Sequence, residues 1–106
     1  MTTPAIVSAV IAAVNDGNVS RFLDLFDTMG VVDDWGSIYR GHEAIRAWSD
    51  RELIGVAANF TLEDTGEHGD TAWMRVQVGG NGFTGPSRFA FSMHDGRIAR
   101  MTITAD

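Results

Sequence analysis

The chain has 106 residues, with 44% hydrophobic and 21% charged side chains, as expected of one soluble globular domain. Its net charge of −6 argues against a nucleic-acid partner, which requires clustered positive charge. Lysine and cysteine are absent, which excludes lysine Schiff bases, thiol nucleophiles and thiolate metal ligands. No apolar run approaches the roughly 20 residues that cross a bilayer, and we recognise no targeting segment. We therefore expect a cytoplasmic protein without a membrane partner.

Helical spacing dominates the first thirty residues. Thr3 can cap a first helix with Pro4 at its first position, and Gly17 would end it. Asn18 can cap a second helix that we expect to continue to Gly30. Each helix repeats apolar residues every three or four positions: Ile6, Val7, Val10, Ile11 and Val14, then Phe22, Leu25, Phe26 and Met29.

The hydrophobic period changes after residue 30. Residues 31–35 and 38–40 read as two short paired strands, with a turn at Gly36-Ser37. Gly41 opens a third helix that we expect over residues 42–53. Its core-facing side chains would be Ile45, Trp48 and Leu53.

The remainder of the chain predicts antiparallel strands. Residues 60–63, 73–78 and 88–93 alternate between apolar and polar side chains, and a last strand covers residues 98–103. Asp95-Gly96 is the strongest turn, because this dipeptide suits a two-residue hairpin. Three helices followed by such a meander predict one α+β domain.

No cofactor and no metal ion is expected. The glycine-rich segment 79–82 precedes a strand rather than a helix, so we interpret it as a hairpin loop and not as a phosphate loop. His42, His68 and His94 stand apart from one another in the sequence and have no ligand spacing.

Five segments together carry a family resemblance, and the third-helix start and the Asp-Gly hairpin are its most specific parts. They are residues 13–18, 22–26, 32–35, 40–48 and 95–101. The chain resembles the SnoaL-like and ketosteroid-isomerase-like branch of the nuclear transport factor two superfamily. That resemblance implies a single domain over residues 1–106. Its fold would be a cone-shaped α+β barrel, with three N-terminal helices in a strongly curved, mainly antiparallel sheet. It also implies a pocket at the open end, but no particular reaction.

Asp34 is the first candidate for chemistry. In the isomerases of the superfamily, a carboxylate at the end of this short strand is the general base, and Asp34 matches that place. A carboxylate in an apolar pocket can serve as a base, because desolvation disfavours its charged form. Alternation along the strand sends Asp33 and Asp34 to opposite faces, so at most one points inward. The alternative interpretation is that both are polar strand-end residues.

Arg75 is the second candidate. Trp73, Arg75 and Gln77 share one strand face, while the intervening residues form an apolar face. An Asp34–Arg75 pair at the pocket floor would hold the carboxylate ionised and could bind a ligand oxyanion or carboxylate. The alternatives are a purely structural ion pair, or an Arg75 that meets solvent.

The sequence also departs from its better-known relatives. In epoxide hydrolases of the superfamily an Arg-Val-Asp strand points into the pocket, whereas this chain has Arg75-Val76-Gln77, and Ile103 replaces their second aspartate. The oxyanion hole of ketosteroid isomerase needs a tyrosine near Val10 and a protonated aspartate on a late strand. Tyr39 is the only tyrosine, and residues 88–92 contain no acid.

Three hypotheses about function stay open. The first is proton transfer on a small apolar carbonyl compound, and the second is binding of a hydrophobic metabolite without chemistry. The residues expected to line such a pocket are Trp35, Trp48, Trp73, Gln77 and Met101. The third is an interaction module that uses an exposed apolar sheet face, formed by Met74, Val76, Val78, Phe89, Phe91 and Met93. A homodimer through the sheet face is expected from the resemblance.

Overall fold

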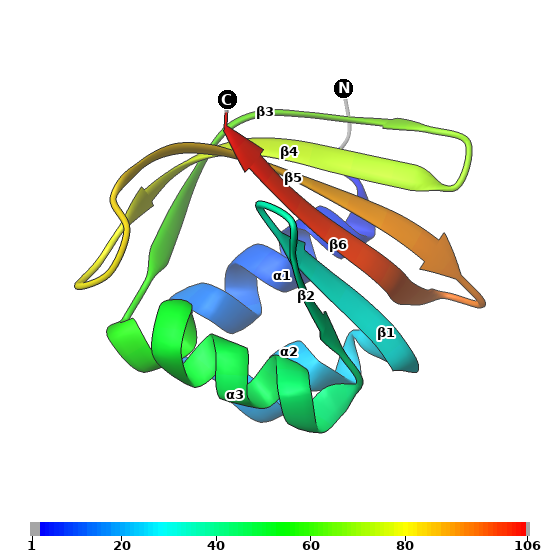
Figure 1. Ribbon diagram of the computed structural model, residues 1–106. Coiled ribbons are helices and arrows are strands. Elements are labelled where there is room, and N and C mark those ends of the chain that lie inside the picture. Colours follow the sequence, from blue (N-terminus) through cyan, green and yellow to red (C-terminus); the bar gives the residue numbers. More distant parts are fainter. Residues whose placement is uncertain (1–2, 106) are drawn as a thin grey trace.

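A curved sheet with three helices inside its concave face forms the molecule in the computed structural model, which describes residues 3–105 (Figure 1). The helices are α1 (Ala5–Asn15), α2 (Val19–Asp24) and α3 (His42–Glu52), and the short 3₁₀ helix η1 (Ile54–Val56) follows α3 directly. The strands are β1 (Phe26–Asp34), β2 (Ser37–Arg40), β3 (Asn59–His68), β4 (Thr71–Gly79), β5 (Gly85–His94) and β6 (Arg97–Ala105).

The six strands form one sheet in the order β2-β1-β6-β5-β4-β3. Neighbours pair antiparallel except β1 and β6, which run parallel, with Asp34 opposite Ile103 in the register. The sheet curls strongly without closing, so β2 and β3 remain as edges (Figure 1). The predicted fold class is confirmed, with an open rather than a closed barrel.

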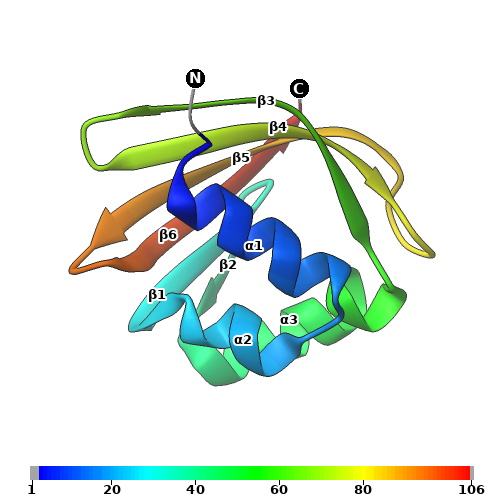
Figure 2. The same cartoon turned by 180° about the vertical axis from the view of Figure 1, so that it is seen from behind.

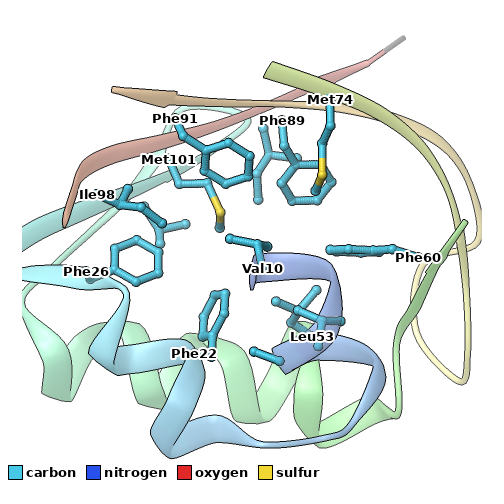
Figure 3. Close-up of a cluster of buried hydrophobic side chains, with 14 of the residues drawn as sticks. Val10, Phe22, Phe26, Leu53, Phe60, Met74, Phe89, Phe91, Ile98 and Met101 are labelled. Atoms are coloured by element: carbon cyan, nitrogen blue, oxygen red, sulfur yellow. The ribbon is translucent and has the colours of Figure 1, made fainter. Parts of the chain in front are cut away.

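The core lies between the concave sheet face and the helices. Figure 2 shows α1 across this face, and α2 and α3 lie on the side of α1 that faces away from β4 and β5. In the close-up, side chains from the sheet and helices meet in one cluster around Val10 (Figure 3). Phe22, Phe91 and Ile98 are fully buried in it. Because apolar residues alternate along β4 and β5, every second side chain enters this core, as the sequence pattern predicts.

The sequence predicted the N-cap of the second helix correctly and the N-cap of the first helix incorrectly. Asn18 caps α2 as predicted, because its Oδ1 accepts a hydrogen bond from the Arg21 N–H at 3.0 Å. Thr3 is not the cap of α1. Pro4 occupies that position in an extended conformation, so the helix begins one residue later than expected.

The second helix is shorter than predicted, and the prediction that it continues to Gly30 is wrong. It ends at Asp24, and β1 begins at Phe26, which pairs with Ile98 of β6. The Ile98 N–H also donates to the Leu25 carbonyl at 2.8 Å. Pairing with a distant strand overrides the local helical spacing, and it leaves Met29 65% exposed.

The later elements follow the expected order with different lengths. Helix α3 buries Ile45 and Trp48 as predicted, and the Asp95-Gly96 hairpin is confirmed by positive φ angles at both residues. Strand β3 is much longer than the expected residues 60–63. It carries a register shift after Leu62 and a largely exposed edge, so its side chains lack a regular apolar alternation.

Candidate functional site

A cavity of about 240 Å³ opens between α3 and the concave face of the sheet. Its walls are mainly apolar and come from α3, β1 and the four later strands. They consist of Asp34, Trp35, Trp48, Glu52, Leu53, Phe60, Val78, Phe83, Ser87, Phe89 and Ile103. Figure 3 shows three of these lining residues, Leu53, Phe60 and Phe89, in the cluster of buried side chains. The resemblance implies a pocket at the open end of the cone, and the structure has a cavity between α3 and the sheet.

Asp34 is held in one orientation at the wall of this cavity. It is the last residue of β1, and its Oδ2 accepts a hydrogen bond from the Trp48 Nε1–H at 3.0 Å. The indole is 1% exposed and packs against the Tyr39 ring, with 6.2 Å between ring centroids. Since Trp48 is fixed by packing, it fixes the carboxylate in turn. The carboxylate thus lines the apolar cavity with one oxygen anchored.

Asp33 points away from the cavity and has a structural role. Its Oδ1 accepts the Gly36 N–H at 2.8 Å, and its Oδ2 accepts Arg100 Nη2 at 2.7 Å. The Gly36 hydrogen bond and then the Arg100 guanidinium hold the pKa of Asp33 below its ordinary value of 3.8. The side chains of these two neighbouring aspartates therefore lie on opposite faces of the sheet, as strand alternation predicts.

Acid should weaken the fold partly through Asp33. A carboxyl whose pKa is lowered by folding stabilises the fold above its unfolded pKa, and this stabilisation is lost as the pH falls through the folded pKa. We expect the free energy of unfolding of Asp33→Asn to depend less on pH than that of the wild type below about pH 4. Urea unfolding at several pH values measures this, with exposed Asp50→Asn as the control. Parallel pH curves for wild type and Asp33→Asn would contradict the assignment.

Two aromatic side chains stand at the mouth of the cavity. Trp35 is 66% exposed and lies in the two-residue turn between β1 and β2, where it and Gly36 both have positive φ. Phe83 is 58% exposed and lies in the loop between β4 and β5. That loop is tied to η1 because the Asn81 N–H donates to the Val56 carbonyl at 2.9 Å. A ligand that enters would cover both rings.

The predicted Asp34–Arg75 pair is not formed. Arg75 projects from the convex face of β4, whereas its neighbours Met74 and Val76 are fully buried on the concave face. Its guanidinium lies 3.9 Å from Asp64 of β3 and is partly exposed. This strand has a polar face and an apolar face, and the polar face lies outside because the helices cover the apolar face.

Trp73 and Gln77 share the convex face and do not line the cavity. Trp73 stacks under the Arg88 guanidinium, 4.3 Å from its ring, and Gln77 is exposed. Met101 lies on the concave face, but it is fully buried in the core toward Val10 and is not among the cavity residues (Figure 3). Of the residues expected to line the pocket, Trp35 and Trp48 do so.

Two polar cavity residues are not among those that the sequence was expected to place in the pocket. Glu52, the last residue of α3, lines the rim. Ser87 also lines the cavity and is only 4% exposed. The sequence contained the information needed to find it, because Ser87 stands two and four residues before Phe89 and Phe91 on an alternating strand.

The hypothesis that an exposed apolar sheet face mediates association is wrong for the face that was expected to do so. That face is formed by Met74, Val76, Val78, Phe89, Phe91 and Met93. Met74, Val76, Phe89 and Phe91 are at most 3% exposed, and the helices of the same chain cover them. A homodimer through the sheet face stays a prediction.

Two features are absent from the described part of the chain. Among residues 3–105, no group of three or more potential metal ligands is brought together. None of the helices in this range is long and apolar enough to span a membrane.

Known proteins of this architecture were found by sequence and by structure. The sequence model of the SnoaL-like domain matches residues 7–101. A Sinorhizobium meliloti protein named a polyketide cyclase is 26% identical, with a TM-score of 0.83 over 95% of this chain and 94% of its own. A Catenulispora acidiphila protein of ketosteroid-isomerase-like fold, solved in complex with trimethylamine, is 23% identical. Its TM-score is 0.84 over 99% of this chain and 88% of its own.

Other solved structures support the fold at lower identity. A nuclear transport factor two-like protein from Cytophaga hutchinsonii is 16% identical, with a TM-score of 0.84 over 100% of this chain and 91% of its own. No curated protein matches the chain. Since the family model covers nearly the whole sequence and the architecture agrees, the chain belongs to the SnoaL-like family.

Proposed function

We propose that the chain binds a small, mostly apolar carbonyl compound in this cavity, and that Asp34 removes a proton from the carbon beside the carbonyl. The observation that carries the proposal is the anchored Asp34 carboxylate at the wall of an otherwise largely apolar cavity. A carboxylate held in one position at the wall of a cavity that a substrate can enter is the geometry that general-base catalysis requires.

The size and lining of the cavity support a small ligand. Its volume of about 240 Å³ lies just under the roughly 300–1,000 Å³ of pockets that take drug-sized molecules. Aromatic rings contribute much of the lining: Trp35, Trp48, Phe60, Phe83 and Phe89. Flat aromatic or alicyclic molecules bury well against such walls. The trimethylamine bound to the Catenulispora protein supports a small-molecule site in this fold.

The charges of the cavity disfavour an anionic ligand. Its ionisable lining residues are Asp34 and Glu52, and no basic residue is among the lining residues of the described chain. A carboxylate or phosphate on the ligand would face these acids without a counter-charge, which costs binding free energy. The ligand carboxylate that Arg75 was expected to bind is therefore not part of the proposal.

The proposed chemistry needs no external oxidant or reductant. The Asp34 carboxylate takes the proton, and the electron pair of the C–H bond forms the C=C bond of an enolate while the negative charge moves to oxygen. Asp34 then returns the proton to carbon, at the same or a conjugated position. An isomerase or a cyclase would use this first step, and the name of the Sinorhizobium relative agrees with such chemistry.

Deuterium exchange tests the proposal directly. 2-Tetralone, a flat bicyclic ketone with acidic protons beside its carbonyl, serves as the probe in D₂O. We expect the protein to accelerate loss of the benzylic proton signal in ¹H NMR, and the non-exchangeable aromatic protons are the internal control. Ile103→Trp, which fills the cavity, should return exchange to the buffer rate. Exchange at the buffer rate with the wild-type protein would contradict the proposed proton transfer.

Binding without chemistry is the second candidate, because the acids of the better-known enzymes of this fold are absent. Ile103 and residues 88–92 provide no carboxylate. This hypothesis expects 2-tetralone to bind without exchange, with an affinity that survives Asp34→Asn. Fluorescence of Trp35 and Trp48 measures that affinity independently of turnover.

A further inference from the structure

The Ser87 hydroxyl is a polar group in the largely apolar wall of the cavity. Ser87 belongs to β5 and is 4% exposed, and it lines the cavity. Within residues 3–105 its hydroxyl makes no hydrogen bond, but no polar side-chain atom of this range is both fully buried and unpaired. The hydroxyl is therefore accessible from the cavity, where it can donate a hydrogen bond to a ligand.

The sheet register places Ser87 opposite Asp34 across the cavity. Asp34 pairs in register with Ile103 of β6, and Ile103 pairs in register with Phe89 of β5. Ser87 is therefore two strands away from Asp34, and two residues along β5 from the position level with it. Strand spacing and rise put the two Cα atoms about 12 Å apart in a flat sheet. The two side chains both enter the concave face, and both line the cavity.

A carbonyl group and its neighbouring carbon can contact both side chains at once. A hydrogen bond from a hydroxyl to a carbonyl oxygen spans about 2.8 Å, and a carboxylate approaches a C–H carbon at about 3–3.5 Å. With the C=O and C–C bonds between them, the path from the Ser87 hydroxyl to the Asp34 carboxylate is at most about 9 Å long. A neutral oxygen acceptor next to an acidic C–H uses both groups.

We infer that Ser87 is the hydrogen-bond donor to the substrate oxygen, which makes the substrate a small ketone or a similar neutral carbonyl compound. This inference rests on the proposed proton transfer by Asp34 and extends it. As the proton leaves carbon, negative charge develops on the oxygen, and the Ser87 O–H stabilises it where no basic side chain lines the cavity of the described chain. In binding, the same contact distinguishes a carbonyl from a hydrocarbon of equal shape.

A matched pair of ligands and a matched pair of variants test Ser87. 2-Tetralone and 2-methylenetetralin differ only by the replacement of C=O with C=CH₂. Ser87→Thr keeps the hydroxyl, and Ser87→Val has nearly the same shape without it; Ser87→Ala removes the hydroxyl without adding volume. We expect the ratio of ketone to alkene affinity in wild type and Ser87→Thr to exceed that in Ser87→Val and Ser87→Ala by roughly tenfold.

Measurements of binding and of proton exchange distinguish this inference from the proposed proton transfer by Asp34 on which it rests. If the affinity ratio falls in Ser87→Ala and Ser87→Val while wild type catalyses no exchange, Ser87 is the carbonyl contact and the proton transfer by Asp34 is wrong. If wild type catalyses exchange and all four proteins share one affinity ratio, Ser87 is not the donor. Failure of wild type to bind 2-tetralone more tightly than the alkene would also overturn the inference. Circular dichroism establishes that each variant is folded.

Discussion

Replacement of Asp34 by asparagine is expected to lower the rate of 2-tetralone exchange by about 10²–10⁴-fold, because a positioned general base contributes that much. Asparagine has nearly the same shape, and its Oδ1 can still accept the Trp48 Nε1–H that now reaches Asp34 at 3.0 Å. The fold and the cavity should therefore survive. ¹H NMR exchange rates measure the loss, and tryptophan fluorescence measures whether the ketone still binds.

Asp33→Asn is the matched control for this variant. It makes the same chemical change at the adjacent residue, whose carboxylate pairs with Arg100 on the other face of the sheet. We expect Asp33→Asn to keep the wild-type exchange rate, with an altered response of stability to acid. Wild-type exchange by Asp34→Asn, or an equal loss in both variants, would show that Asp34 is not the base.

Gly55→Ala is expected to cause the largest loss of stability. A Cβ at this position would lie 1.8 Å from the carbonyl oxygen of Asp50 and 2.5 Å from its carbonyl carbon. Since both atoms are backbone, the end of α3 and η1 would have to separate. We expect a loss of about 3 kcal/mol or more in the free energy of unfolding, which lowers Tm by roughly 12–24 °C in a domain of this size.

Gly17→Ala is the comparison for Gly55→Ala. Gly17 has a φ of +66°, but nothing lies within 4 Å of its added Cβ, so the cost is the left-handed backbone alone. That cost is about 1–2 kcal/mol. Thermal unfolding followed by circular dichroism measures both variants. If Gly55→Ala is no less stable than Gly17→Ala, close packing of η1 on α3 is not what requires glycine.

The sequence by itself determined the parts of the fold that depend on local chemistry. Asn18 predicted a helix start, and Asp95-Gly96 predicted a hairpin, because each supplies the hydrogen bond or the backbone freedom that its position requires. Alternation predicted that Asp33 and Asp34 lie on opposite faces of β1, as they do. The family motifs at both ends of the sheet predicted the curved α+β architecture.

Only the tertiary structure decided which sheet face lines the cavity, and that choice governs the site. Trp73, Arg75 and Gln77 have the same two-residue period as the residues between them, so periodicity alone cannot say which set points inward. The helices cover the apolar set, because burial of Met74 and Val76 removes more apolar surface from water. Arg75 consequently pairs with Asp64 outside, and Ser87 faces the cavity instead.

The start of β1 is likewise determined by tertiary contacts. Phe26 fits the spacing of a helix, but its pairing with Ile98, more than seventy residues later, provides backbone hydrogen bonds and core burial that an extended α2 would lose. Local sequence therefore determined the turns, the helix start at Asn18 and the alternation of the strands. Long-range burial decided where the second helix ended and which polar side chains met across the cavity, because that free energy depends on residues far apart in the chain.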